Sequence, residues 1–183
     1  TLLSTIGASS GKYYCEAKCV TLGTYAMVGI CDMNADAQNS SSAWYLGATA
    51  GSAQYGYNSN DGNIYTNDSN SSYGTSFTTG DIMGIAMDLD NSKLYFSKNG
   101  TWQNSGVPTS GSTGTGAVSI TADKTYGFGF SSYASTVWYI NFGNGYFSTG
   151  AVASAGTNAS GNGIFEYDTP TGYTALSTKG LNL

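Results

Sequence analysis

The sequence predicts an all-β protein, and three observations support this prediction. Charged residues make up only 9% of the 183-residue chain, which contains 26 glycines and 15 tyrosines. Residues that cover helix surfaces are therefore scarce, whereas turn formers and β-favouring aromatics are abundant. Short predicted strands recur about every 8–12 residues between turn signals, and no segment shows a helical period. This spacing is typical of two packed antiparallel sheets.

The clearest element is a predicted β-hairpin within residues 80–103. Apolar residues 82–89 and 94–97 predict its strands, and the short polar residues 90–92 predict the turn between them. A second turn is predicted at Asn99-Gly100, because both residues adopt positive φ at low cost. We expect the notable side chains of this hairpin to be structural, and these are Asp88, Asp90, Asn91, Asn99, Gly100 and Trp102.

Other strands are predicted along the rest of the chain. Residues 12–21 alternate, which places Cys15 on the buried face of a half-buried strand and Tyr14 and Glu16 on the opposite face. Residues 25–33 are uniformly apolar and predict a central strand. Shorter strands are predicted at 44–47, 54–57, 117–120, 126–133 and 136–142. The predicted organisation is a sandwich over residues 1–145, a flexible Gly/Ser/Ala-rich insertion over 146–163, and an extension over 164–183 that packs on the sandwich.

Composition excludes several classes of function. The net charge of −5 argues against nucleic acid and against anionic lipid, which both require a basic surface. The chain has no His, so Ser-His-Asp and Cys-His nucleophiles are excluded. No apolar run approaches the roughly 20 residues that span a bilayer, so no membrane insertion is expected. Because the chain starts almost inside a predicted strand, we expect it to be a fragment of a larger protein.

The cysteines at positions 15, 19 and 31 are odd in number, so they cannot all pair within the chain. We expect them to be small buried apolar residues. A Cys15–Cys31 or Cys19–Cys31 disulfide remains an alternative. A zinc site is not expected, because the chain has no fourth thiol and no His.

Several stretches together resemble the SPRY (B30.2-like) domain. They are G-K-Y-Y-C-E at 11–16, Y-G-Y-N-S-N-D-G-N-I-Y at 55–65, the whole hairpin at 80–103, Y-G-F-G-F at 126–130 and N-F-G at 141–143. The segment at 165–181 is similar to an extension on SPRY domains of bacteriophage and bacterial structural proteins. The resemblance implies a bent antiparallel β-sandwich of concanavalin-like topology with a C-terminal strand extension. It also implies a non-catalytic binding module whose partners meet the loops at one end.

Two chemical alternatives to a simple binding module deserve weight. Concanavalin-like sandwiches also include glucanases, which need two paired carboxylates, and Asp88 and Asp90 alternate onto one face. The only glutamates are Glu16 and Glu166, at opposite ends of the chain, so we expect no enzyme activity. Cofactors are not expected either, although Ca²⁺ is an alternative because oxygen-bearing side chains crowd one loop. These side chains, which ordinary turn chemistry also explains, are Asn58, Asn60, Asp61, Asn63, Asn67, Asp68 and Asn70.

A ligand site is predicted in the aromatic segment at 40–75. Aromatic faces with Asn and Asp hydrogen-bonding groups suit a carbohydrate cleft, although core packing and cross-strand pairing are the favoured explanation for these aromatics. Tyr57 and Tyr65 match family positions that pack in the core. The tentative ligand-binding residues are Trp44, Tyr45, Tyr73, Asn60 and Asp61.

These expectations combine into one leading hypothesis of function. The chain is expected to be a binding or structural module of a phage virion protein, such as a tail fibre, head appendage or capsid decoration protein. Its expected partners are other virion proteins or a host-surface receptor or glycan. It is expected to be located in the virion or outside the cell, and its parent assembly is expected to be a homo-oligomer. One alternative is a lectin-like domain that binds host glycan. A further alternative is a self-assembling extracellular filament subunit.

Overall fold

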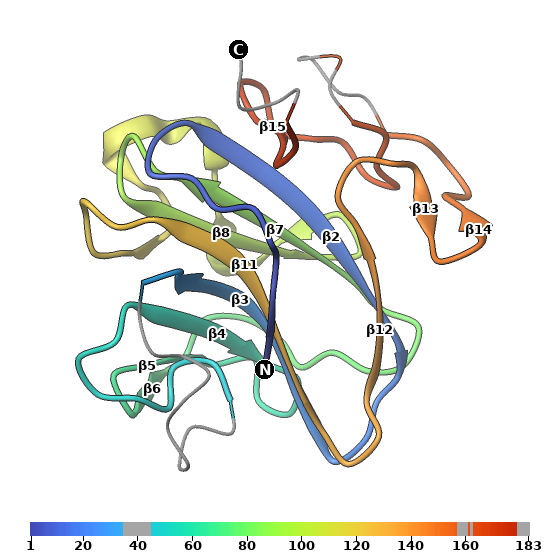
Figure 1. Ribbon diagram of the computed structural model, residues 1–183, viewed down its shortest axis with the longest axis horizontal. Coiled ribbons are helices and arrows are strands. Elements are labelled where there is room, and N and C mark those ends of the chain that lie inside the picture. Colours follow the sequence, from blue (N-terminus) through green and yellow to red (C-terminus); the bar gives the residue numbers. More distant parts are fainter. Residues whose placement is uncertain (35–44, 157–160, 162, 179–183) are drawn as a thin grey trace. The chain divides into compact units, whose positions relative to one another are not determined.

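The computed structural model describes residues 1–34, 45–156, 161 and 163–178, and within them the chain is all-β, as predicted (Figure 1). Two 3-10 helices, η1 (Gln103–Ser105) and η2 (Pro108–Thr113), interrupt the strands. No helix among the described residues is long and apolar enough to cross a membrane. The strands are β1 (Leu2–Leu3), β2 (Lys12–Thr21), β3 (Tyr25–Asp32), β4 (Gln54–Asn58), β5 (Ile64–Thr66), β6 (Ser69–Ser71), β7 (Ile82–Asp88), β8 (Lys93–Lys98), β9 (Thr101–Trp102), β10 (Val118–Ser119), β11 (Tyr126–Tyr133), β12 (Val137–Asn141), β13 (Tyr146–Phe147), β14 (Gly150–Ala151) and β15 (Thr174–Ala175).

The chain divides into two compact units, each built from separated segments. The first comprises Thr1–Ser9, Cys19–Gly80 and Ile120–Trp138. The second comprises Ser10–Lys18, Asp81–Ser119 and Tyr139–Leu183. The predicted division at residues 145 and 163 stays a prediction.

The first unit contains an antiparallel sheet of six strands in the order β1-β11-β3-β4-β5-β6. β3 lies between β11 and β4, and every residue of this strand after Tyr25 is buried. The prediction of a central apolar strand at 25–33 is therefore confirmed. Such a strand favours apolar and β-branched residues because neither face meets water.

A row of glycines crosses the middle of this sheet and makes room for one large side chain. The register pairs Gly129 with Gly29, and Gly29 with Gly56, on adjacent strands. A Cβ atom on Gly56 would lie 2.7 Å from Cβ of Leu46, and one on Gly129 would lie 2.9 Å from a methyl group of the same leucine. Leu46 is fully buried. The missing side chains thus form the recess in which Leu46 packs.

The loop that carries Leu46 was predicted as a strand at 44–47, and this prediction is wrong for the described residues 45–47. They form a turn, and Gly47 adopts a φ of +86° that a strand does not allow. Side chains replace a strand partner: the backbone N–H of Leu46 donates to Ser131 Oγ at 3.0 Å, and that of Gly47 donates to Gln54 Oε1 at 3.1 Å.

The second unit contains a sheet in the order β10-β8-β7-β2-β12, with β9 added beside β8 and β15 beside β2. β15 runs parallel to β2, whereas the predicted hairpin strands β7 and β8 are antiparallel. The hairpin is confirmed, with each strand within a residue or so of its expected limits. The core packed on this sheet comprises Tyr14, Ala86, Tyr95, Phe165, Tyr173 and Ala175, with Trp102 against it.

β2 is not the half-buried strand that its alternation predicts. Tyr14 and Glu16, expected on the open face, are both fully buried. The ring of Phe165 packs edge-on against that of Tyr14 at a centroid distance of 4.9 Å, so residues from the end of the chain cover this face. The alternation of residues along a strand indicates which face is more polar, but not whether another segment covers that face. Here the covering residues lie about 150 residues further along the chain.

The acidic residues of the hairpin form hydrogen bonds and an ion pair at its first turn. Asp88 is fully buried and accepts hydrogen bonds from the backbone N–H of Asn91 at 3.1 Å and from its Nδ2 at 2.8 Å. Lys12 Nζ lies 2.7 Å from the Asp88 carboxylate and supplies its countercharge. Asp90 accepts from the backbone N–H of Gly11 at 2.7 Å. These carboxylates close the turn and attach it to β2.

The second turn of the hairpin depends on Asn99. This residue has a φ of 48°, its Oδ1 accepts from the Ile82 N–H at 2.8 Å, and its Nδ2 donates to Asp81 at 2.6 Å. We expect Asn99→Ala to lower the free energy of unfolding by about 2 kcal/mol, because it removes two hydrogen bonds and because Ala tolerates the left-handed conformation less well than Asn. Asn99→Gly, which removes only the hydrogen bonds, should cost about half as much. Urea denaturation followed by circular dichroism measures both, and equal stability of all three proteins would contradict the prediction.

The cysteines and the 146–163 segment complete the fold. Cys15, Cys19 and Cys31 are buried, as expected, and none of them is in a disulfide. Burial raises the pKa of Cys31 to about 12, so this thiol is unreactive. Within the segment predicted as a flexible insertion, β13 and β14 form a short hairpin.

Candidate functional site

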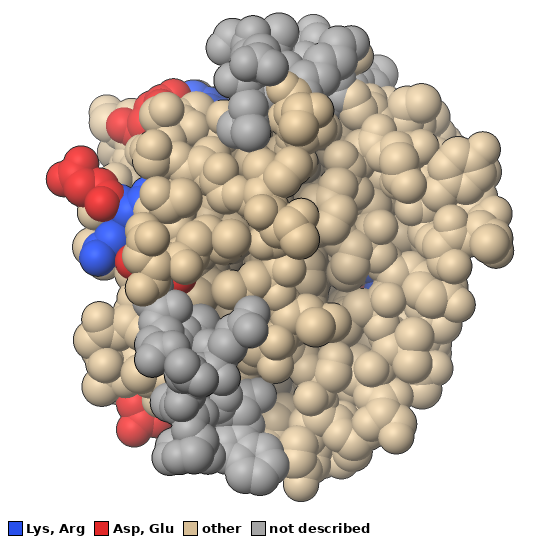
Figure 2. All heavy atoms as spheres, viewed as in Figure 1, with Lys and Arg blue, Asp and Glu red and all other residues tan. Residues whose placement is uncertain are grey.

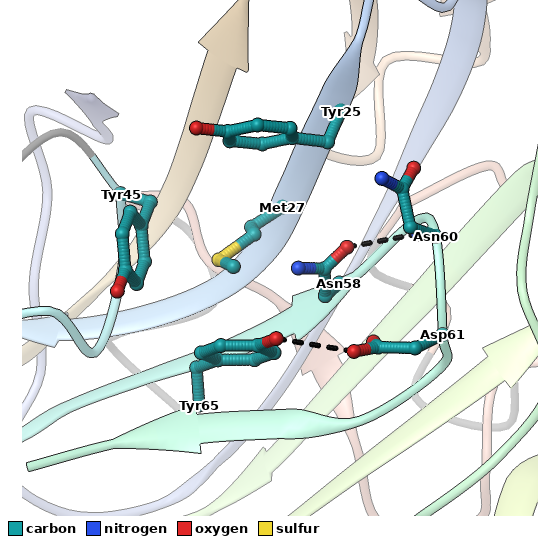
Figure 3. Close-up of a pocket in the computed structure, with 7 residues that line it drawn as sticks. All are labelled: Tyr25, Met27, Tyr45, Asn58, Asn60, Asp61 and Tyr65. Carbon is teal, nitrogen blue, oxygen red and sulfur yellow. Dashed lines mark hydrogen bonds between the residues drawn. The ribbon is translucent and has the colours of Figure 1, made fainter. Parts of the chain in front are cut away.

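A pocket of about 290 Å³ opens in the first unit, at one end of β3, β4 and β5 (Figure 3). Tyr25 and Met27 project into it from β3, and Tyr65 from β5. The turn between β4 and β5 supplies the polar side, and Tyr45 comes from the loop before β4. The residues that line the pocket are Tyr25, Met27, Tyr45, Asn58, Asn60, Asp61 and Tyr65.

The glycine row described above positions Tyr45. Leu46 is locked over Gly56 and Gly129, and its N–H is bound to Ser131. Tyr45 immediately precedes this anchor, so its ring is directed toward Tyr65, which it meets at a centroid distance of 5.7 Å and an interplanar angle of 88°. A loop residue thereby acquires a fixed position beside the sheet.

Three tyrosine rings lie around the pocket on three sides, with Met27 between them (Figure 3). The ring of Tyr133 stacks on that of Tyr25 at a centroid distance of 4.8 Å and an interplanar angle of 7°. This pair is also a cross-strand pair in the register of β3 and β11. The three rings are half-buried, so part of each remains open to a ligand.

The fourth side of the pocket is polar and is organised by Asx turns. Asn58 Oδ1 accepts from the Asn60 N–H at 2.8 Å, and Asp61 Oδ1 accepts from the Asn63 N–H at 3.0 Å. The hydroxyl of Tyr65 donates to Asp61 Oδ2 at 3.1 Å. Burial raises the pKa of Tyr65, and its hydrogen bond to the Asp61 carboxylate raises it further, so the phenol stays neutral and remains a donor at physiological pH.

The structure brings together three of the five tentative ligand-binding residues, namely Tyr45, Asn60 and Asp61. Tyr73 lies elsewhere: it is half-buried and packs edge-on against Tyr57 at 6.0 Å. Trp44 lies outside the described residues.

Sequence reasoning missed four lining residues of this pocket. Tyr65 was assigned to core packing, Tyr25 and Met27 were considered only as parts of a strand, and Asn58 was considered only for turn chemistry and the Ca²⁺ alternative. One available signal was the spacing of Tyr25 and Met27, because residues two apart on a strand share a face. The proximity of that face to Tyr65 depends on the pairing of β3 with β4 and of β4 with β5.

A second pocket of about 460 Å³ lies within the second unit and includes two of the hairpin residues, Gly100 and Trp102. Tyr167 packs against Gly100, since a Cβ atom there would lie 2.6 Å from its ring. The Glu166 carboxylate in this pocket already accepts backbone hydrogen bonds from Ala153 at 2.6 Å and Ser154 at 3.2 Å. Its polar groups are thus engaged in holding their own loop.

No group of three or more Cys, Asp or Glu side chains in the described part of the chain is arranged to hold a metal ion. The loop oxygens of Asn58 and Asp61, considered for Ca²⁺, bind backbone N–H groups of their own turn. A calcium site stays an untested alternative.

The sequence model of the SPRY domain matches residues 12–122, and the chain belongs to the SPRY domain family. Members of this family mediate protein–protein interaction. The SPRY domain of human HERC1 superimposes with a TM-score of 0.57 at 19% identity, over 75% of this chain and 79% of that one, which confirms the predicted fold class.

Curated relatives come from animals. The Drosophila melanogaster Ran-binding proteins 9/10 homolog is 32% identical over 98 residues, which are 52% of this chain and 10% of the relative. Ran-binding protein 10 of Danio rerio and Ran-binding protein 9 of Mus musculus are each 33% identical over the same length, 52% of this chain and 15% and 14% of the relatives. The chain therefore spans only a small part of these proteins.

Proposed function

We propose that this chain is a non-enzymatic binding module that receives part of a partner protein in the pocket between Tyr25, Tyr45 and Tyr65. The observation that carries this proposal is the set of three half-buried tyrosine rings held around one opening. Tyrosine combines a large apolar face with a polar tip and loses little rotamer freedom on binding, and it is enriched at interfaces for these reasons. Membership of the SPRY family supports the same function.

The chemistry of the pocket favours binding over catalysis. Among the described residues that line it, Asp61 is the one carboxylate, and glycoside hydrolysis by the usual route requires two. The two carboxylates of the hairpin considered for that chemistry, Asp88 and Asp90, belong to the second unit and hold its turn. No lining residue is a nucleophile paired with a base.

Affinity capture with matched variants tests this function. Immobilised wild-type protein is compared with Tyr45→Ser, Tyr65→Ser and the control Tyr139→Ser, which removes a tyrosine that is 37% exposed on β12. We expect the amount of partner protein captured by each pocket variant to be at least about tenfold lower than the amount captured by the wild type and by the control. Truncation of an interface tyrosine commonly lowers affinity by that factor. Equal capture by all four proteins, with circular dichroism confirming that they are folded, would refute a role for the pocket.

A glycan ligand is a second candidate, favoured by the tyrosine rings and the Asn and Asp groups of the same pocket. A glycan array probed with the wild type, Tyr45→Ser and Tyr139→Ser distinguishes the two functions. If the wild type and Tyr139→Ser bind glycans on the array but Tyr45→Ser does not, the ligand of the pocket is a carbohydrate and not a protein. An array without such signals would leave the protein partner in place.

We also propose a virion or extracellular setting, in which the module belongs to a phage structural protein that assembles as a homo-oligomer. Support comes from the resemblance of residues 165–181 to phage-type extensions, and from a surface poor in charge: most of the described face in Figure 2 carries neither Lys nor acidic side chains. The relatives, by contrast, are animal Ran-binding proteins, and their names describe those proteins. The neighbouring genes test this setting, because a locus without capsid or tail genes would refute it.

A further inference from the structure

The arrangement of the pocket suggests which group of a partner it takes. We infer that the space between Tyr25, Tyr45 and Tyr65 is a cation site that binds the alkylammonium group of a lysine side chain. This inference rests on the proposed function, because it names the chemistry by which the same pocket recognises its partner.

The aromatic geometry is the first step of this argument. The rings of Tyr45 and Tyr65 stand at 88° to one another, and Tyr25 lies across the pocket from Tyr65 (Figure 3). The face of an aromatic ring carries partial negative charge, so a cation within about 6 Å of the ring centroid is attracted to it. Figure 3 shows the three rings on three sides of the pocket, with the Met27 side chain between them, so an ammonium group bound in this pocket lies near more than one ring. A sugar ring, in contrast, stacks best on one flat, open face.

The charge of the polar side is the second step. Asp61 is exposed at the mouth of the pocket, and each of its carboxylate oxygens accepts one hydrogen bond, from Asn63 N–H or from the Tyr65 hydroxyl. An ionised carboxylate offers about four acceptor positions, so Asp61 retains the capacity to receive an ammonium group. A carboxylate ligand would be repelled both by Asp61 and by the ring faces.

No ion pair among the described residues gives Asp61 a cationic neighbour. No Lys is among the described residues that line the pocket. The ion pairs of the described residues join Lys12 to Asp88, Lys98 to Asp81 and Lys124 to Asp32, so none of them neutralises Asp61. Together with a net charge of −5, this leaves the site negative and ready for an external cation.

Titration of the full chain with capped Gly-Lys-Gly tripeptides, followed by the amide NMR signals of the protein, tests this inference. The lysine of the peptide is unmodified, Nε-trimethylated or Nε-acetylated. We expect the unmodified and Nε-trimethyl peptides to shift the signals of Tyr25, Tyr45, Asp61 and Tyr65 with a Kd of about 1 mM, as suits a single side chain. The Nε-acetyl peptide keeps the length but loses the charge, and it should bind at least about fivefold more weakly. Equal binding of the acetylated peptide would overturn the inference.

Matched variants locate the effect. Asp61→Asn should weaken the lysine peptide about three- to fivefold, whereas Asp123→Asn removes an exposed carboxylate outside the pocket and should leave binding unchanged. Tyr65→Phe keeps the ring face and should stay within about twofold of the wild type, and Tyr65→Leu should lose binding about fivefold. Equal weakening by Asp61→Asn and Asp123→Asn would show attraction to the general negative charge and would refute the site.

The two levels of the proposal fail in different ways. If the capture experiment identifies a partner that Tyr45→Ser loses, but the pocket signals do not distinguish charged from acetylated lysine, the cation site is wrong and the binding module stands. If capture is indifferent to Tyr45→Ser and Tyr65→Ser, the proposed function itself is wrong, whatever the tripeptides show.

Discussion

Glu16→Ala is expected to lower the free energy of unfolding by about 4 kcal/mol, because it removes the acceptor of two buried backbone donors and leaves a cavity. The Glu16 carboxylate is fully buried within the second unit. Its Oε2 accepts from the Glu166 N–H at 2.8 Å, and its Oε1 accepts from the Tyr167 N–H at 2.9 Å. Without it, both N–H groups lose their partner, and the segment around residue 166 loses its attachment to β2.

Further contacts strengthen this attachment. Asn141 Nδ2 lies 3.4 Å from the Glu16 carboxylate and also donates to the Ile164 carbonyl at 2.9 Å, and the Tyr14 hydroxyl donates to Glu16 at 3.3 Å. One carboxylate therefore connects β2, β12 and residues 164–167. Partly satisfied buried networks are costly, so the loss should exceed that of one typical hydrogen bond.

Glu166→Ala is the matched control for this prediction. Glu166 also accepts two backbone hydrogen bonds, but it is only half-buried, so water can replace its oxygens. Its loss should cost about 1 kcal/mol. Urea denaturation with circular dichroism measures both variants, and a Glu16→Ala protein as stable as Glu166→Ala would contradict the proposed role.

The pH dependence of stability provides a second readout for Glu16. Burial raises the pKa of its carboxyl above the ordinary glutamate value, although the hydrogen bonds from Glu166, Tyr167 and Tyr14 act in the opposite direction. The folded state therefore holds a proton that the unfolded state releases, and the resulting stabilisation is present at pH values below the ordinary glutamate pKa. It is lost as the pH rises through the raised pKa. The wild type should thus lose stability relative to Glu16→Gln as the pH increases from about 4 to 7, and the reverse trend would contradict the assigned pKa direction.

Gly29→Ala is expected to destabilise the protein by about 3 kcal/mol or more, because the added methyl group overlaps backbone. A Cβ atom on Gly29 would collide with the carbonyl oxygen of Tyr55 on β4. This oxygen has no rotamer by which to move aside. β3 cannot shift either, since it is hydrogen-bonded to β11 on one side and to β4 on the other.

The expected damage from Gly29→Ala extends to the pocket. Forcing β3 and β4 apart separates Tyr25 and Met27 from Asn58, so any variant that still folds should also lose binding. Gly150→Ala is the control, because a Cβ atom there finds its nearest neighbour, the Phe147 carbonyl oxygen, at 3.6 Å. It should stay within about 0.5 kcal/mol of the wild type. Thermal and urea unfolding compare the proteins, and similar melting of both glycine variants would rule out the proposed clash.

The hairpin and the pocket differ in how far the sequence predicts them. For the hairpin, both strands, the turn at 90–92 and the positive φ of Asn99 follow from short-range signals, and the structure confirms them. For the pocket, Tyr45, Asn60 and Asp61 were anticipated because they cluster in the chain, whereas Tyr25 comes from some 20 residues earlier. Its place opposite Tyr65 results from strand register, which no local pattern specifies.

The amino-acid sequence is thus sufficient for the all-β class, the hairpin and membership of a binding family, because turn residues and strand periodicity act between neighbours in the chain. The burial of Glu16 and Tyr14 is a property of the tertiary structure, since residues 164–167 reach them from the far end of the chain. The tyrosine-lined pocket is another, because it requires the pairing of β3, β4 and β5 and the recess that a row of glycines leaves for Leu46. Both depend on contacts between distant segments, and only the folded chain brings such segments together.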